Sequence, residues 1–239
     1  MDKLLSGKIA VVTGGTRGIG RAIAERLLRE GASVAFCGRS PESVARAAGE
    51  MTKTTGGAVL GETADVSKPE EVVRFFQKVD SRFGGLHMLI NNAGLGIFQR
   101  VAELSVDEWR QMIDLNLSGV FYCCREALQR FNNADGGYII NISSLAGKNA
   151  FSGGAGYNAS KFGLNGFSEA LMMDHRYDNV GVTYIMPGSV DTKFSSGAPG
   201  SDDWKIAPAD VAEVVMGLLR MPKRTLVSRV EMRPLKPKK

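Results

Sequence analysis

Short apolar runs alternate with longer stretches of helical periodicity along nearly the whole chain, and this alternation most constrains the fold. A strand that is followed by a helix and then by another strand favours parallel pairing, with helices on both faces of the sheet. We therefore expect an α/β fold, a doubly wound parallel sheet of about seven strands, in one domain spanning residues 1–239. The expected strands are 8–13, 33–38, 58–63, 87–91, 137–142, 181–187 and 225–231, and the expected helices are 18–30, 41–53, 69–82, 107–131, 156–176 and 208–220.

The first expected strand runs into a glycine-rich segment, TGGTRGIG at residues 13–20, which opens the first helix. Such a loop lets the backbone approach a pyrophosphate closely, and a helix N-terminus favours negative charge. The spacing departs from the G-x-G-x-x-G fingerprint. A tight turn without a ligand is the alternative interpretation.

Tyr157 and Lys161 lie four residues apart in an expected helix, so their side chains share one face. An ordinary phenol has a pKa of about 10, and a nearby cation favours the phenolate. The pair could therefore donate and accept a proton near neutral pH, and we expect Lys161 to lower the pKa of Tyr157. Alone, this spacing also occurs on solvated helices without any function.

Three further segments end expected strands: Asn91-Asn92-Ala93-Gly94, Ile139 to Ser144, and Pro187 to Thr192. Together with the glycine loop and the Tyr157–Lys161 pair, they make the chain resemble the short-chain dehydrogenase/reductase family over residues 7–232, and the 3-oxoacyl-(acyl-carrier-protein) reductase-like members in particular. The resemblance implies a single-domain Rossmann fold with strand order 3-2-1-4-5-6-7. In such sheets, ligands bind at the carboxyl ends of the strands, where these motifs converge.

The resemblance implies a catalytic group of Asn116, Ser144, Tyr157 and Lys161. Tyr157 would exchange a proton with the substrate oxygen, and Ser144 would hydrogen-bond that oxygen. Lys161 would bind the nicotinamide ribose, and Asn116 would hold a water leading to Lys161. Ser143 competes with Ser144, although the thirteen-residue spacing to Tyr157 favours Ser144. Asn116 could instead satisfy a buried kink in its helix.

The end of the second strand predicts the cofactor. Gly38 stands where members of this family that prefer NAD carry an acid, and Arg39 follows it. Arginine suits the 2′-phosphate of NADP, so we expect NADP(H), with Arg17 as a second basic residue. Arg39 could also be an ordinary surface arginine. The expected cofactor-binding residues are Gly14, Thr16, Arg17, Gly18, Ile19, Gly20, Arg39, Asp65, Val66, Asn92, Ala93, Gly94, Tyr157, Lys161, Pro187, Gly188, Val190 and Thr192.

The implied activity is hydride transfer between NADP(H) and a carbonyl or secondary alcohol, as in a ketone reductase of the 3-oxoacyl type. Another ketone, a sugar or a steroid stays open as substrate, and a non-catalytic NADP(H)-binding regulator is the alternative from another class. The stretch from Ser189 to Ala207 is too short for a large helical lid and has Phe194 and Trp204 as its apolar points. Five apolar residues could line a substrate pocket or could equally pack in the core: Leu95, Ile97, Phe98, Leu145 and Phe151.

The charge and the composition exclude other classes. The net charge is +5, but residues 220–239 carry +7, so the rest of the chain is weakly acidic. We interpret the basic tail from about residue 233 as solubilising or frayed rather than as a nucleic-acid contact. The apolar runs are too short to span a membrane, and residues 1–6 lack the apolar segment of a secretory signal, so we expect a cytoplasmic protein. The three cysteines and two histidines form no metal motif, and we expect no metal.

Two expected helices carry more apolar residues than one buried stripe requires. The excess runs from Trp109 to Phe131 and from Phe162 to Met173. In the family, these helices pack against symmetry mates. We therefore expect a homodimer or homotetramer, with the tetramer favoured slightly. The alternative is a monomer whose extra apolar residues lie under loops.

Overall fold

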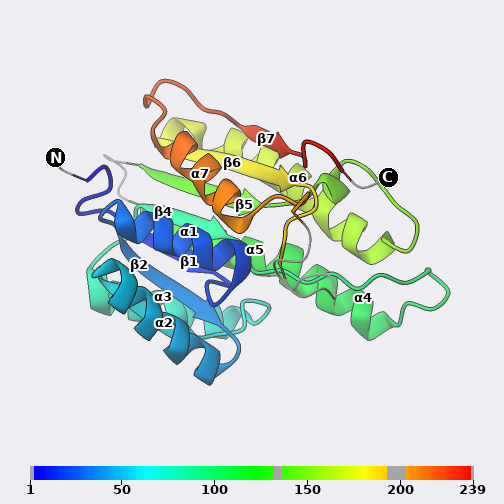
Figure 1. Ribbon diagram of the computed structural model, residues 1–239, viewed down its shortest axis with the longest axis horizontal. Coiled ribbons are helices and arrows are strands. Elements are labelled where there is room, and N and C mark those ends of the chain that lie inside the picture. The colour runs from blue at the N-terminus through cyan, green and yellow to red at the C-terminus, as the bar shows by residue number, and fades with distance from the viewer. Residues whose placement is uncertain (1–2, 132–135, 193–202, 238–239) are drawn as a thin grey trace.

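A computed structural model describes residues 3–131, 136–192 and 203–237 of the 239-residue chain. Its seven strands form one parallel sheet in the order β3-β2-β1-β4-β5-β6-β7 (Figure 1). The predicted fold class and strand order are therefore confirmed. The strands are β1 (Ile9–Thr13), β2 (Ser33–Gly38), β3 (Val59–Thr63), β4 (Met88–Asn91), β5 (Gly137–Ile142), β6 (Val180–Pro187) and β7 (Arg229–Met232).

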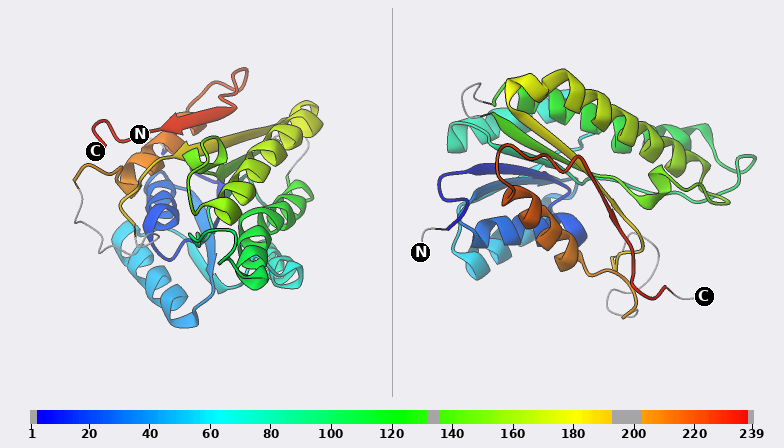
Figure 2. Two further views of the ribbon diagram at one scale, coloured as in Figure 1. Left: turned by 90° about the vertical axis from the view of Figure 1, so that its right-hand side faces the viewer. Right: turned by 90° about the horizontal axis from the view of Figure 1, so that it is seen from above.

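Helices cover both faces of the sheet, as the left view in Figure 2 shows. One apolar core lies under α1 (Gly18–Arg29), α2 (Pro41–Thr55) and α7 (Pro208–Leu219). A second core lies under α3 (Pro69–Phe83), α5 (Gly119–Leu128) and α6 (Ala155–His175). Successive residues of β1 point to opposite faces, so Val12 joins the first core and Val11 the second. Burial on both faces explains why the strand sequences read as continuous apolar runs.

The helix ends follow from local sequence. Ser40 caps α2 by accepting a hydrogen bond from the Ser43 N–H at 3.2 Å, and Pro41 occupies the first turn. Gly56 ends this helix with φ 65°, a left-handed conformation that glycine adopts without steric cost. The Ser40 cap fixes the start of α2 directly after Arg39, which lies in the loop between β2 and α2.

The expected helix 107–131 is the main departure from prediction. The structure divides it into α4 (Val106–Ile113), one π-helical turn (Asp114–Ser118) and α5. The wider turn contains Asn116, whose fully buried side chain bonds to groups outside the helix. Periodicity alone gives no signal for a single inserted residue of this kind.

The last strand is shorter than predicted. Residues 225–228 precede it as irregular chain, because the Thr225 N–H closes a turn on the Pro222 carbonyl at 2.8 Å. Pairing with β6 begins where the Tyr184 N–H donates to the Ser228 carbonyl. Across the three described ranges, no helix is both long enough and apolar enough to cross a bilayer.

Candidate active site

The glycine loop joins β1 to α1 and is tied to the end of β4. Gly14 and Gly18 have φ values of 66° and 56°, so both positions need glycine. A Cβ on Gly20 would lie 2.4 Å from the Gly14 carbonyl oxygen, which shows how tightly the loop folds onto the helix start. The Thr13 hydroxyl accepts hydrogen bonds from the main-chain N–H groups of Asn92 and Ala93, both at 3.0 Å. Two strand ends therefore form one rigid edge.

The two serines after β5 have different surroundings. Ser143 is 5% exposed and donates a hydrogen bond to Asn165 Oδ1 at 2.5 Å, which fastens β5 to α6. Both serines line the cavity, but the Ser144 hydroxyl accepts a hydrogen bond from the Ala146 N–H at 3.1 Å and is also hydrogen-bonded to Tyr157. The geometry therefore places Ser144, and not Ser143, next to the tyrosine.

Tyr157 and Lys161 lie one turn apart near the start of α6, and both side chains are buried. Lys161 Nζ donates to the Ile142 carbonyl at 2.9 Å and lies 5.9 Å from the centre of the Tyr157 ring. Burial lowers the pKa of Lys161 to about 8. Burial also raises the pKa of Tyr157, and the hydrogen bond to Ser144 opposes that rise only in part.

In the protein alone, the net pKa of Tyr157 is therefore raised, opposite in direction to the lowering expected from Lys161. Lys161 Nζ donates to the strand carbonyl of Ile142, and the loss of hydration around the buried phenol is the largest effect on the pKa of Tyr157. Consequently, the Tyr157 hydroxyl keeps its proton at neutral pH.

Asn116 makes three hydrogen bonds from the π-helical turn. Its Oδ1 accepts from the Leu95 N–H at 2.9 Å, and its Nδ2 donates to the Leu95 carbonyl at 2.8 Å and to the Ser160 hydroxyl at 3.0 Å. A Cβ on Gly94 would lie 3.2 Å from Asn116 Oδ1 and 3.8 Å from Lys161 Nζ. The missing side chain at Gly94 thus leaves space between these two polar groups.

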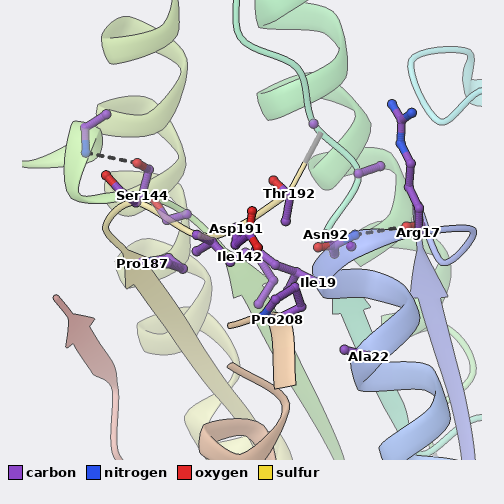
Figure 3. Close-up of a pocket in the computed structure, with 18 of the residues that line it drawn as sticks. Arg17, Ile19, Ala22, Asn92, Ile142, Ser144, Pro187, Asp191, Thr192 and Pro208 are labelled. Carbon is purple, nitrogen blue, oxygen red and sulfur yellow. Dashed lines mark hydrogen bonds between the residues drawn. The ribbon is translucent and has the colours of Figure 1, made fainter. Parts of the chain in front are cut away.

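A single cavity of about 1450 Å³ runs along this edge of the sheet (Figure 3). Figure 3 shows Arg17 and Asn92 on one side of it and Ser144 and Pro187 on the other. Of the predicted site residues, only Gly20 and Asn116 do not line it. Those that do are Gly14, Thr16, Arg17, Gly18, Ile19, Arg39, Asp65, Val66, Asn92, Ala93, Gly94, Ser144, Tyr157, Lys161, Pro187, Gly188, Val190 and Thr192.

The predicted substrate-side residues divide into two sets. Phe98, Leu145 and Phe151 line the cavity, and the Phe98 ring packs edge-on against both Phe151 and Tyr157 with centroid distances of 5.6 and 5.5 Å. Leu95 and Ile97 instead pack against the small apolar cluster around Met112. Trp204 lines the cavity, whereas Phe194 lies outside the described residues.

One end of the cavity is strongly basic. Arg17, Arg39 and Arg46 are exposed there, and none of them has an ion-pair partner among the residues that the structure describes. Arg21 nearby differs, because it is paired with Glu25 and Glu50. A Cβ on Gly38 would lie 2.7 Å from the Thr16 methyl group, so an acidic side chain has no room there.

The sequence prediction missed several lining residues. Ser43 and Arg46 lie in the first two turns of α2, four and seven residues beyond Arg39, and helical spacing could have indicated them. Arg233, Pro234 and Pro237 reach the cavity from the tail, where no motif indicated a role. Within the described part of the chain, no cluster of histidine, cysteine and carboxylate side chains could hold a metal ion.

The sequence profile described as short chain dehydrogenase matches residues 8–200, most of the chain. The chain belongs to the short-chain dehydrogenase family. Curated oxidoreductases, themselves uncharacterised, are similar over nearly their whole length. One from Staphylococcus aureus strain MRSA252 is 35% identical over 97% of this chain and 99% of its own, and one from Staphylococcus saprophyticus is 34% identical over the same shares.

Solved structures of short-chain dehydrogenases superpose closely on this chain. An alcohol dehydrogenase from the archaeon Thermococcus sibiricus, complexed with 5-hydroxy-NADP, is 34% identical with a TM-score of 0.90 and covers 97% of this chain and 99% of its own. A metagenomic short-chain oxidoreductase in complex with NADP is 35% identical with a TM-score of 0.86, over 98% and 100%. This chain is thus a short-chain oxidoreductase in fold and in family.

Proposed function

We propose that this protein is an NADPH-dependent reductase of ketones. The observation that carries the proposal is that Ser144, Tyr157 and Lys161 share one cavity with the glycine loop and with three unpaired arginines at its basic end. Hydrogen-bonding and proton-donating groups thus lie in the same space as a phosphate-binding loop.

The residues present fit a nicotinamide dinucleotide. The left-handed glycines at 14 and 18 leave the main chain open to a pyrophosphate at the start of α1. Arg17, Arg39 and Arg46 would hold a 2′-phosphate, and the closed space at Gly38 disfavours the acid that an NAD site uses. Two similar solved enzymes contain NADP or its 5-hydroxy derivative, which supports NADP(H). Asp65 and Val66 would bracket the adenine.

The nicotinamide, when bound, supplies the hydride in the reducing direction. Tyr157 donates its hydroxyl proton to the carbonyl oxygen, and its raised pKa means that the hydroxyl is protonated at neutral pH before the reaction. Ser144 hydrogen-bonds the same oxygen and stabilises the charge that develops on it. Lys161, held by the Ile142 carbonyl, stabilises the phenolate that Tyr157 becomes and would bind the nicotinamide ribose.

Asn116 does not line the cavity and would act on the catalytic residues from behind its wall. Its bonds to Leu95 and Ser160 hold the β4 loop against α6, and the space at Gly94 lies between its Oδ1 and Lys161 Nζ. We propose that a water in this space would connect the two groups and return a proton towards Tyr157. The alternative role of Asn116, which is to satisfy the polar groups of the buried helix kink, would use these same hydrogen bonds.

We place 3-oxoacyl thioesters first among substrates, because the cavity is open and Phe98 and Phe151, each 46% exposed, offer apolar surface beside Tyr157. The test is NADPH oxidation with a panel of carbonyl compounds that includes acetoacetyl thioesters. Tyr157→Phe should lower the rate by roughly a hundredfold or more, whereas Tyr177→Phe, at a residue that is 90% exposed, should leave it unchanged.

Two outcomes would count against this proposal. Activity that survives in Tyr157→Phe would remove this residue from the proton-donating role. NADPH binding without reduction of any carbonyl in the panel would point instead to a non-catalytic NADP(H)-binding regulator.

We also propose a homodimer or homotetramer, with the tetramer slightly favoured, acting as a single catalytic domain in the cytoplasm. Trp109, Phe121, Phe162 and Met173 are 41–56% exposed on α4, α5 and α6. Met112, Val120 and Leu164 on the same helices are buried in the cores. The four exposed residues are therefore additional to the one apolar stripe that each helix buries. Apolar surface of this kind is typical of a subunit contact.

A further inference from the structure

The last described residues of the chain form a wall of the cavity, which we call the tail wall: Arg233, Pro234 and Pro237. The tail is held there by the loop after β6. The Gly188 N–H donates to the Met232 carbonyl at 2.8 Å, and a Cβ on Gly188 would lie 3.2 Å from Pro234 Cδ. Since Gly188 itself lines the cavity, these contacts place the tail beside the site rather than leave it frayed.

The segment just before α7 lies on the other side of the same loop. The Asp191 N–H donates to the Ile206 carbonyl at 2.9 Å, and the Ile206 N–H donates to the Ser189 carbonyl at 3.0 Å. In Figures 1 and 2, this segment (orange) and the tail (red) lie next to each other. Trp204 and the tail wall therefore border one region of the cavity.

Positive charge dominates at the tail wall. Glu231 forms ion pairs with Lys148 at 2.6 Å and with Arg233 at 3.1 Å, so two cations share one carboxylate. The Lys148 pair is the larger cause of the lowered pKa of Glu231. The bond to Glu231 uses one of the five N–H donors of Arg233. An excess cation with free donors thus lies at the cavity edge.

Trp204 supplies a second observation that points to a ligand. Its indole N–H is buried and has no hydrogen-bond partner in the part of the chain that the structure describes. An unsatisfied buried donor is costly, and native proteins rarely keep one without a reason. An acceptor on a bound molecule would satisfy it. Both the indole N–H and the guanidinium favour a ligand that carries acceptor oxygens.

We propose that Arg233 binds an anionic group of the ketone substrate, a carboxylate or a phosphate remote from the carbonyl. The inference rests on the proposed ketone reductase activity, because it places the reacting carbonyl at Tyr157 and the anionic end at the tail wall. Arginine suits this role because its planar fork bonds both oxygens of such groups. Asp191 also lines the cavity, and Lys205, which lines it too, offsets its charge formally.

The test compares pairs of ketones in which one member is anionic and the other is uncharged. The first pair is 4-oxo-4-phenylbutanoate and its methyl ester, and the second is acetoacetyl-coenzyme A and acetoacetyl-N-acetylcysteamine, which lacks the phosphates. The readout is the ratio of kcat/KM within each pair, for wild type, Arg233→Gln, Arg233→Lys and Lys236→Gln. Lys236→Gln is the matched control, since it removes one charge from the same tail at a residue outside the cavity lining.

Wild type should prefer the charged member of at least one pair. Because Arg233 is exposed to solvent, Arg233→Gln should reduce that preference by about twofold to fivefold, less than a buried pair would give. Arg233→Lys should restore part of it, and Lys236→Gln should not change it. Added salt should weaken the preference. A preference in the first pair that Arg233→Gln reduces identifies a carboxylate, and such a preference in the second pair identifies a phosphate.

The proposal would be overturned if Arg233→Gln left the kcat/KM ratio unchanged in both pairs. It would also be overturned if Lys236→Gln reduced the preference for the charged ketone as much as Arg233→Gln does. Reduction of the uncharged ketones without any preference would overturn this inference and leave the proposed function standing. If no ketone is reduced, the proposed function fails for these substrates. Calorimetry then measures the affinities of wild type and the same variants for 4-oxo-4-phenylbutanoate and its ester, with and without NADP⁺. Tighter binding of the acid that Arg233→Gln removes would support the role of Arg233, and equal binding of acid and ester would overturn it.

Discussion

The ammonium nitrogen of Lys161 lies 5.9 Å from the centre of the Tyr157 ring, with the two residues one turn apart on α6. The ammonium is fixed in this position, because its hydrogen bond to the Ile142 carbonyl anchors it to the end of β5. Only 4% of Lys161 is exposed, and burial lowers its pKa from 10.5 to about 8. Keeping this buried cation next to the phenol therefore destabilises the folded protein. A costly buried charge of this kind is typical of a functional position.

Replacing Lys161 by methionine should stabilise the protein while abolishing activity. At pH 7, the substitution removes a buried charge, and we expect the free energy of unfolding to rise by about 1–3 kcal/mol. The unfolded chain holds the lysine proton more tightly than the folded chain between pH 8 and 10.5. Wild-type stability therefore rises through that window relative to the variant, and the advantage of methionine should shrink.

Urea unfolding of both proteins at pH 7 and near pH 10 measures this difference. Lys78→Met, at an exposed position of α3, is the control and should change stability little at either pH. A Lys161→Met protein that is less stable than wild type at pH 7 would show that the bond to Ile142 outweighs the cost of burial.

Ser143 and Ser144 offer a second test, because they are adjacent and chemically identical. Ser144→Ala should lower kcat by about a hundredfold, the usual effect of losing one donor to a developing oxyanion. Ser143→Ala breaks the buried bond to Asn165 and should cost about 1 kcal/mol of stability while leaving kcat within a fewfold. Turnover and thermal unfolding of both variants separate the two roles. A larger kcat loss in Ser143→Ala would reverse our assignment.

The fold was predictable from sequence to a large extent because the central strands β1, β2 and β4 are buried on both faces and several helices have clear ends. Pro41, Pro69 and Pro208 all occupy first turns, and Gly56 and Gly84 end helices in left-handed conformations. Local signals of this kind act within a few residues, so they survive without knowledge of tertiary contacts. The strand order itself came from the family resemblance rather than from these signals.

Features that depend on contacts distant in sequence were not predictable. The π-helical turn exists where Asn116 bonds Leu95 and Ser160, which lie 21 and 44 residues away along the chain. The raised pKa of Tyr157 depends on how deeply α6 is buried, which the Tyr-x-x-x-Lys spacing does not report. The position of Arg233 depends on the pairing of Met232 with Gly188.

Cofactor preference should depend on Arg39. Wild type should bind NADPH more tightly than NADH, and Arg39→Ala should reduce that difference by about 1–2 kcal/mol, because the lost hydrogen bonds are charge-assisted but solvent-exposed. Arg74→Ala, at an exposed position of α3 outside the cavity, is the control. Fluorescence titration with both nucleotides measures the two affinities. A wild-type preference for NADH would contradict the proposed role of Arg39.

The exposed apolar face of α4, α5 and α6 should be a subunit contact. Phe121 and Phe162 are 45% and 46% exposed, and the Phe121 ring packs edge-on against Phe167 of α6 with centroids 6.3 Å apart. The apolar surface of α5 is therefore continuous with that of α6. Burial of this face against a second copy would remove it from water, and a two-fold pairing is the commonest arrangement.

Light scattering at micromolar concentration should give a mass two or four times the 25.7 kDa of one chain. The double variant Phe121→Glu/Phe162→Glu places two carboxylates in the contact and should shift the mass to that of a smaller species, because each carboxylate would lose its hydration there. Val73→Glu is the matched control, since Val73 is 37% exposed on α3 and is not on α4, α5 or α6. A wild-type mass of one chain would refute the predicted assembly. A double variant that keeps the wild-type mass would place the contact elsewhere, because two buried and unpaired carboxylates would be too costly for the same face to stay closed.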